Sequence, residues 1–154
     1  MAKIVYILYT FYDIIRENSN LLIRTRAKIE QLIHKEGPKM REEIEKYINE
    51  NYDSIQEYPW IKYPNFTTFK HRNSKKWFAL MMDVQFEKLG INKEGTVDVI
   101  NLKNIPEMVG SLRKVEGILP AYHMNKEHWI TILLDGTVPK QKICNLIDIS
   151  YDLT

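Results

Sequence analysis

The segment Pro120–Gly136, PAYHMNKEHWITILLDG, holds the densest group of chemically versatile side chains in the sequence. Its first half presents a phenol, two imidazoles, an amide and an ammonium group, on Tyr122, His123, Asn125, Lys126 and His128. Side chains of these types bind phosphate oxygens and other anionic groups. Trp129, which follows, is either a core residue or a platform on which a planar ligand stacks.

The two histidines of this segment suggest an alternative chemistry, as a metal-binding or proton-transfer pair. Their spacing argues against it, because side chains five residues apart fall on opposite faces of a strand and helical metal sites use an i,i+4 spacing. No further Cys or His lies nearby in the sequence. We therefore expect hydrogen-bonding side chains that face an anion, with no metal and no cofactor.

Sequence signatures of common enzymes are also missing. The patterns GxGxxG, GxxxxGK[ST], GxSxG and HExxH do not occur in the chain. The nucleotide-binding, hydrolase and zinc-peptidase interpretations therefore lack their usual geometry. We expect a protein without catalytic residues.

A second candidate site is the most basic run of the chain, KHRNSKK. Its charged members are Lys70, His71, Arg72, Lys75 and Lys76. At the tip of a β-hairpin these side chains could enter a groove of DNA or lie along its phosphates as a wing. The alternative is a solvated turn whose lysines protect the flanking apolar strands from edge-to-edge pairing.

The elements that position both sites follow from the spacing of apolar residues. We expect helices over 38–51, 105–117 and 139–153 and strands over 65–71, 76–84, 96–102 and 129–134, with a loop over 85–95. The strands flanking the basic run form one hairpin. This order predicts an α+β domain, with an antiparallel-rich sheet and helices packed on one face.

The first 38 residues predict a separate helical extension. Apolar positions recur there at helical spacing on both sides of Asn18-Ser19-Asn20, which indicates an αα-hairpin. Gly37-Pro38 then marks a boundary, so the main domain covers 39–154. Because two helices alone bury little apolar surface, we expect the extension to mediate docking or homo-oligomerisation.

Bulk properties narrow the class of protein further. The chain has 154 residues, a net charge of +2 and a single cysteine, so it can form no internal disulfide and no cysteine-based zinc site. Its most apolar stretch, Ile4–Tyr12, is too short to span a bilayer. We expect a soluble cytoplasmic protein. The charge permits nucleic-acid binding without indicating it.

Five stretches of the chain from about Met40 to Thr154 resemble the MmcQ/YjbR family. They are EYPW at 57–60, FKHRNSKKWFAL at 69–80, INLK with IPE at 100–107, LPAYHMNKEHWITILLDG at 119–136 and ISYDLT at 149–154. The resemblance implies a frataxin-like (CyaY-like) α+β fold with a double-wing arrangement and a DNA-binding function.

The resemblance also implies where functional side chains lie. The family's signature polar positions fall on Lys103, Tyr122, His123, Asn125, Lys126, His128, Trp129, Ser150 and Tyr151. The cysteine that often follows the INLK lysine in the family is Asn104 here, which argues against a thiol or metal role. Residues 1–39 lie outside the resemblance.

DNA binding is the function that these observations favour. In this hypothesis the Lys70–Lys76 hairpin and the Tyr122–His128 turn are two wings on duplex phosphates, with Arg113 and Lys114 as auxiliary contacts. Exposed, electropositive wings would support it.

The alternative function is a frataxin-like protein that binds a metal or a small ligand. It would use the acidic side chains of Arg41–Glu57 or the aromatic surroundings of Tyr58, Trp60 and Trp129. A closed apolar pocket ringed by Tyr122, His123 and Ser150 would support a small ligand.

Overall fold

The structure is a computed structural model that describes residues 39–154. Within it, Met40–Thr154 forms one compact unit. The predicted helical extension over 1–38 and its role in oligomerisation lie outside the described residues. No helix in the described part of the chain is long and apolar enough to cross a membrane.

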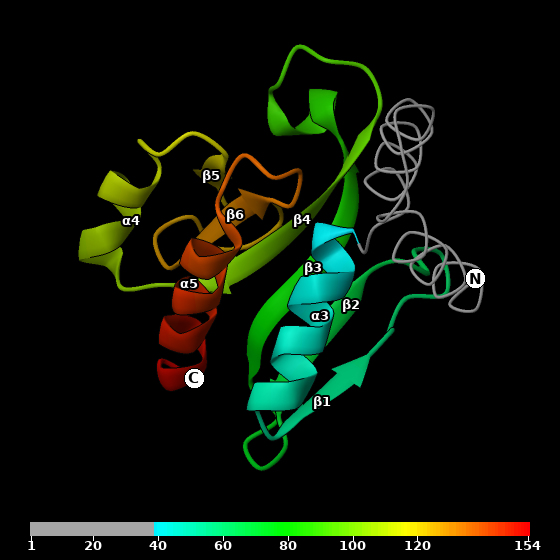
Figure 1. The fold of residues 1–154 in the computed structure, drawn as a ribbon, viewed down its shortest axis with the longest axis vertical. Helices are drawn as coiled ribbons and strands as arrows, with labels where there is room; N and C mark the ends of the chain where they lie inside the picture. Colours follow the sequence, from blue (N-terminus) through cyan, green and yellow to red (C-terminus); the bar gives the residue numbers. More distant parts are fainter. Residues whose placement is uncertain (1–38) are drawn as a thin grey trace, which may run out of the picture. The chain divides into compact units, whose positions relative to one another are not determined.

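A six-stranded antiparallel sheet is the centre of the fold (Figure 1). Its spatial order is β1-β2-β3-β4-β6-β5. The strands are β1 (Ser54–Glu57), β2 (Thr67–His71), β3 (Trp77–Gln85), β4 (Thr96–Lys103), β5 (Ile118–Pro120) and β6 (Trp129–Leu133). The long strands β3 and β4 pair over seven positions in the middle of the sheet.

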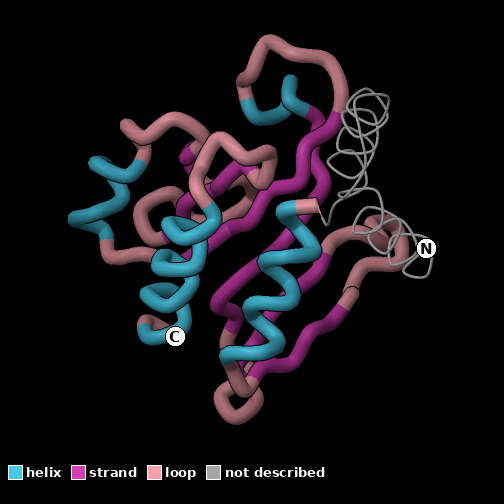
Figure 2. The backbone as a smooth tube through the Cα atoms, viewed as in Figure 1, coloured by secondary structure: helices cyan, strands magenta, loops and turns pink. Residues whose placement is uncertain are grey.

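Helices cover one face of this sheet, which confirms the predicted class (Figures 1 and 2). They are α3 (Met40–Asn51), α4 (Pro106–Leu112) and α5 (Lys140–Asp152). The apolar stripe of α3 buries Ile44 and Ile48, and that of α5 buries Ile143 and Ile147, against inward-facing strand residues such as Ile100. Burying each of these side chains contributes about 1.5–3 kcal/mol.

Loops and a short 3₁₀ helix, η1 (Phe86–Leu89), cover the other face. A second apolar cluster lies there, formed by buried residues of β3, β4 and β6 together with Phe86 of η1. Around it pack half-buried aromatic and aliphatic side chains, namely Trp60, Phe66, Trp77, Leu89, Ile91, Leu119, Tyr122 and Met124. The two faces of the sheet are therefore covered by different kinds of structure.

A β-bulge near the start of β3 decides which side chains reach the loop-covered face. Phe69 pairs with Ala79 and Lys70 with Trp77, so Phe78 is an extra residue opposite β2. Phe78 and Ala79 both belong to the helix-side core, whereas Trp77 packs with the second cluster. The bulge thus turns Trp77 away from the helices.

Three differences from the sequence prediction concern the short elements and the end of one helix. Strands β1 and β5, which the sequence did not predict, lie at the two edges of the sheet. Helix α3 ends at Asn51, as predicted, so Asp53 and Glu57 lie beyond it and do not share a helix face with its glutamates. Helix α4 ends at Leu112 rather than near Gly117, and the 85–95 loop contains η1.

The sole cysteine, Cys144 on α5, is 4% exposed in the helix-side core. Burial raises the pKa of its thiol. The thiolate form, which is the nucleophile and the metal ligand, is therefore disfavoured.

Two glycines give a matched test of the backbone. Gly117 has φ +84°, and a Cβ there would lie 2.8 Å from Cγ2 of Val138, whereas a Cβ on Gly110 in α4 would meet nothing within 4 Å. We expect Gly117→Ala to lower the free energy of unfolding by about 1–3 kcal/mol. Gly110→Ala should raise it by roughly 0.4–1 kcal/mol. Urea denaturation measures the free energy of unfolding of both variants. Equal changes in the two would contradict the positive φ and the close contact at Gly117.

Candidate nucleic-acid interface

Tyr122 is fixed by a short chain of buried hydrogen bonds. The hydroxyl of Thr131 accepts from the Tyr122 backbone N–H at 2.8 Å and donates to Oδ1 of Asn101 at 2.5 Å. Nδ2 of Asn101 donates to the Tyr122 carbonyl at 2.7 Å. Asn101 and Thr131 face each other on β4 and β6 and are both fully buried. The loop that carries Tyr122 is therefore held against the sheet at a defined place.

The turn that follows is shaped mainly by backbone groups. The Asn125 side chain accepts from the Glu127 N–H at 2.8 Å, and the Asn125 carbonyl accepts from the Trp129 N–H at 2.9 Å. The Asn104 N–H donates to the His128 carbonyl at 2.7 Å, and Arg113 donates to the Lys126 carbonyl. Asn125 thus has a structural role in the turn.

The side chains of this turn divide into exposed and buried ones. His123, Asn125, Lys126 and His128 are exposed, while Tyr122 is half-buried. His123 has φ 58°, an uncommon conformation for a residue other than glycine. Trp129 is 9% exposed, so it is a core residue and not a stacking platform.

The basic hairpin is less free than its sequence indicates. Lys70 forms an ion pair with Glu57, and Arg72 forms one with Asp53. Nε2 of His71 lies 2.9 Å from the Tyr151 carbonyl and 2.8 Å from Oγ1 of Thr154, so this ring is bound to the end of α5.

Four lysines at these sites have no acidic partner in the described part of the chain. Lys75 and Lys76 are exposed in the turn between β2 and β3. Among residues 39–154, no carboxylate lies within 4 Å of the ammonium group of Lys75, Lys76, Lys103 or Lys126.

The strand pairing brings the two predicted wings to one end of the sheet. Ala79 pairs with Leu102 and Lys103 pairs with Trp129, so β3 begins, β4 ends and β6 begins at the same end. The hairpin turn and the Asn125–His128 turn therefore both leave from this end, with Lys103 between them. Since neighbouring strands are ~4.8 Å apart, two strand spacings put the turns roughly 10 Å apart at the sheet.

The remaining predicted positions have mixed environments. Arg113 is half-buried after α4 and contacts the turn through its bond to Lys126, and Lys114 beside it is exposed. Ser150 is fully buried on the helix side, where its hydroxyl accepts from the Lys103 N–H at 2.8 Å and donates to the Phe78 carbonyl at 2.5 Å. Ser150 therefore joins α5 to two strands and does not share a pocket with Tyr122.

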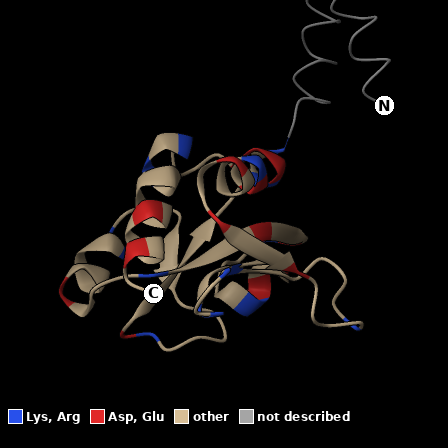
Figure 3. Ribbon diagram, turned by 90° about the horizontal axis from the view of Figure 1, so that it is seen from below, with Lys and Arg blue, Asp and Glu red and all other residues tan. Residues whose placement is uncertain are grey.

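Charge is not gathered on one face of the domain. Figure 3 shows acidic and basic positions interspersed over the described ribbon, and the net charge of the chain is only +2. Any attraction for a polyanion has to come from local groups such as the four lysines. Within Lys39–Thr154, no three His, Cys, Asp or Glu side chains come together in a way that could hold a metal ion.

Two hollows flank the Tyr122 loop on the face away from the helices. The larger, of about 830 Å³, is lined by Trp60, Phe66, Trp77 and Tyr122 among others, and we call it the aromatic groove. The smaller, of about 430 Å³, includes Lys88, His123 and Lys126. The sequence prediction named Trp60 but not Trp77, since only the bulge at Phe78 brings Trp77 to this face.

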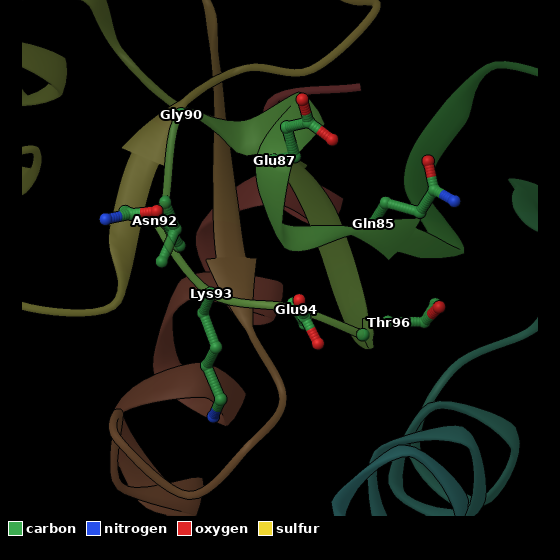
Figure 4. Close-up of a pocket in the computed structure, with 9 residues that line it drawn as sticks. Gln85, Glu87, Gly90, Asn92, Lys93, Glu94 and Thr96 are labelled. Carbon is green, nitrogen blue, oxygen red and sulfur yellow. The ribbon is translucent and has the colours of Figure 1, made fainter.

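A third hollow, of about 590 Å³, lies within the loop that connects β3 to β4. The side chains that line it point in different directions and not toward a common point (Figure 4). Convergent polar groups are what fixes a ligand in a binding site, and this loop lacks them.

Comparison with known proteins gives these features a family context. The model of the YjbR family matches residues 50–153. The chain belongs to the YjbR family. The family segment contains the whole sheet together with η1, α4 and α5, whereas most of α3 precedes it.

Relatives of known sequence and structure agree with this membership. The chain is 49% identical to YyaQ of Bacillus subtilis (strain 168) over 74% of this chain and 97% of that protein. It is 42% identical to YjbR of Escherichia coli (strain K12) over 49% and 65% of the two chains. A crystal structure of a Pseudomonas syringae protein superposes with a TM-score of 0.72 and 51% identity, over 74% of this chain and 97% of that one.

The bonds that hold Tyr122 give a test of the site's architecture. Thr131→Val removes the hydroxyl and leaves the Tyr122 N–H and the Asn101 side chain without this partner in a buried place. We expect the free energy of unfolding to fall by about 1–3 kcal/mol. The same change at the exposed Thr96 of β4 should stay within about 0.5 kcal/mol. Chemical denaturation compares the two, and a Thr131→Val variant as stable as the Thr96→Val variant would refute the buried bridge.

Proposed function

We propose that this chain is a non-catalytic DNA-binding protein that contacts duplex phosphates with one end of its sheet. Lys75 and Lys76 of the hairpin turn form one contact, Lys126 and His128 of the second turn form the other, and Lys103 lies between them. The observation that carries the proposal is the convergence of these turns on one sheet end, with four lysines that no described carboxylate neutralises.

The dimensions of this end suit a duplex. The two turns start roughly 10 Å apart, which is of the same order as the ~12 Å width of the major groove. Lysine ammonium groups bind phosphate as point charges, so the contacts need no particular base sequence. Lys114, exposed beside Arg113, adds an auxiliary contact next to Lys126.

Three residues that the sequence predicted as DNA contacts, Lys70, His71 and Arg72, have supporting roles in this proposal. Lys70 and Arg72 are paired with acidic side chains, and His71 binds the end of α5. A phosphate would have to displace these partners. They hold the hairpin in place, and the lysines of its tip make the contact.

Salt dependence tests the proposal directly. Each phosphate that a lysine neutralises adds about 0.9 to the slope of log affinity against log salt concentration. We expect the combined change of Lys75, Lys76 and Lys126 to Gln to reduce the slope by up to ~2.7 and to weaken duplex binding at low salt. Fluorescence anisotropy of a labelled duplex, titrated at several salt concentrations, gives both quantities.

The matched control removes the same charge elsewhere. Lys46 and Lys140 lie on α3 and α5, and Lys93 lies in the loop at the opposite end of the sheet. Their combined change to Gln should leave the slope nearly unchanged. An unaltered slope in the first variant, or equal losses in both, would contradict the proposal.

A further inference from the structure

The aromatic groove, of about 830 Å³, is the larger of the two hollows that flank the Tyr122 loop. Leu80, Met82 and Val84 of β3 form its floor, and Trp60, Trp77 and Tyr122 form much of its wall. Its volume of about 830 Å³ lies within the usual range of ligand sites. The side chains of this wall come from loops and from the start of β3. Each of the three is half-buried.

Around Trp60, the rings of this groove meet edge to face. Trp60 stands perpendicular to Trp77, with 5.8 Å between centroids and 90° between planes, and nearly perpendicular to Phe66, at 6.0 Å and 80°. Trp60 is therefore stacked face to face on neither of them. A flat aromatic ligand can stack where the protein's own rings do not.

The smaller hollow beside the groove is cationic. Lys88, Tyr122 and His123 line both hollows, and Lys126 lines the smaller one. Among the described residues that line the two hollows, Asp83 is the one carboxylate, and it accepts a hydrogen bond from Asn65. Among residues 39–154, no carboxylate lies within 4 Å of the Lys88 ammonium group.

We propose that the aromatic groove and the adjoining cationic hollow bind an unpaired nucleotide of single-stranded DNA. The base stacks against Trp60 and Tyr122, and the phosphate is held by Lys88 and Lys126. Aromatic stacking with backbone-tracking basic side chains is the physical basis of single-strand binding. A base within a duplex is stacked on both faces, so only an unpaired base can enter the groove.

This inference goes beyond contact with duplex phosphates. The duplex contacts are assigned to the sheet end at Lys75, Lys76 and Lys103, whereas the groove lies on the loop-covered face. Lys126 is shared between the two. A protein with both surfaces would bind a junction where a duplex opens into a single strand.

The test uses the full chain and a short fluorescein-labelled oligothymidine, followed by anisotropy at low salt. We expect saturable binding and quenching of tryptophan fluorescence, because Trp60 and Trp77 line the groove. Trp60→Leu should weaken binding about five- to hundredfold, the equivalent of losing the stack of one base. Lys88→Gln, on an exposed residue of η1, should weaken binding and lower the salt slope by about 0.7, the value for one phosphate of a single strand.

Two control variants match these changes outside the groove. Tyr58→Leu removes an aromatic ring that is 57% exposed, and Lys46→Gln removes a lysine on α3. Both should bind the oligonucleotide as the original chain does. Thermal unfolding of every variant shows whether Trp60→Leu remains folded, and Lys88→Gln tests the site independently of the core.

Several results would overturn the inference. One is the absence of oligonucleotide binding at any accessible concentration, and another is unchanged affinity in both groove variants. Thymidine monophosphate bound as tightly as the oligonucleotide would assign the groove to a free nucleotide. A change in tryptophan fluorescence with protein concentration alone would assign it to a second copy of the chain.

Duplex DNA titrated in parallel separates this inference from the proposed function. Loss of duplex binding only on changing Lys75 and Lys76, with loss of oligonucleotide binding only on changing Trp60, supports both. A chain that binds the oligonucleotide through the groove but no duplex would overturn the proposed function and support the groove inference.

Discussion

A buried amide in the middle of the sheet constrains the rest of the site. Asn101 is fully buried in β4 among mostly apolar strand residues, and an amide without partners there would cost about 1–3 kcal/mol. Thr131 and the backbone of Tyr122 satisfy it. The loop after β5 is thereby bound to the sheet. This attachment fixes the position of Tyr122, which forms part of the wall of the aromatic groove. It also fixes where the chain enters the Asn125–His128 turn.

The difference between the two faces of the sheet explains why one of them is hollow. Three helices with continuous apolar stripes pack closely on the first face. On the second face the cover is made of loops, whose backbone must remain near water. Large aromatic side chains fill part of the remaining space, and the bulge at Phe78 supplies one of them by turning Trp77 outward. What they leave unfilled is the groove.

The sequence predicted the elements that carry strong periodicity and missed those that depend on partners. Helices α3 and α5 and the hairpin of β2 and β3 have clear apolar patterns, and the family resemblance agreed with them. Strand β1, SIQE, has one apolar residue, and β5 is three residues long and ends in Pro120. Both are strands only because a neighbour pairs with them. The engagement of His71 with the end of α5, 80 residues away, has no local signal either.

The packing of α5 has a practical consequence for spectroscopy. The chain has one thiol, that of Cys144, and it is enclosed in the core with a raised pKa. Thiol-directed reagents act on the accessible thiolate, so the folded protein presents almost nothing for them to modify. A cysteine introduced at an exposed position such as Thr96 would be the sole labelling site. A dye or spin label can therefore be attached at one chosen place with the native cysteine retained.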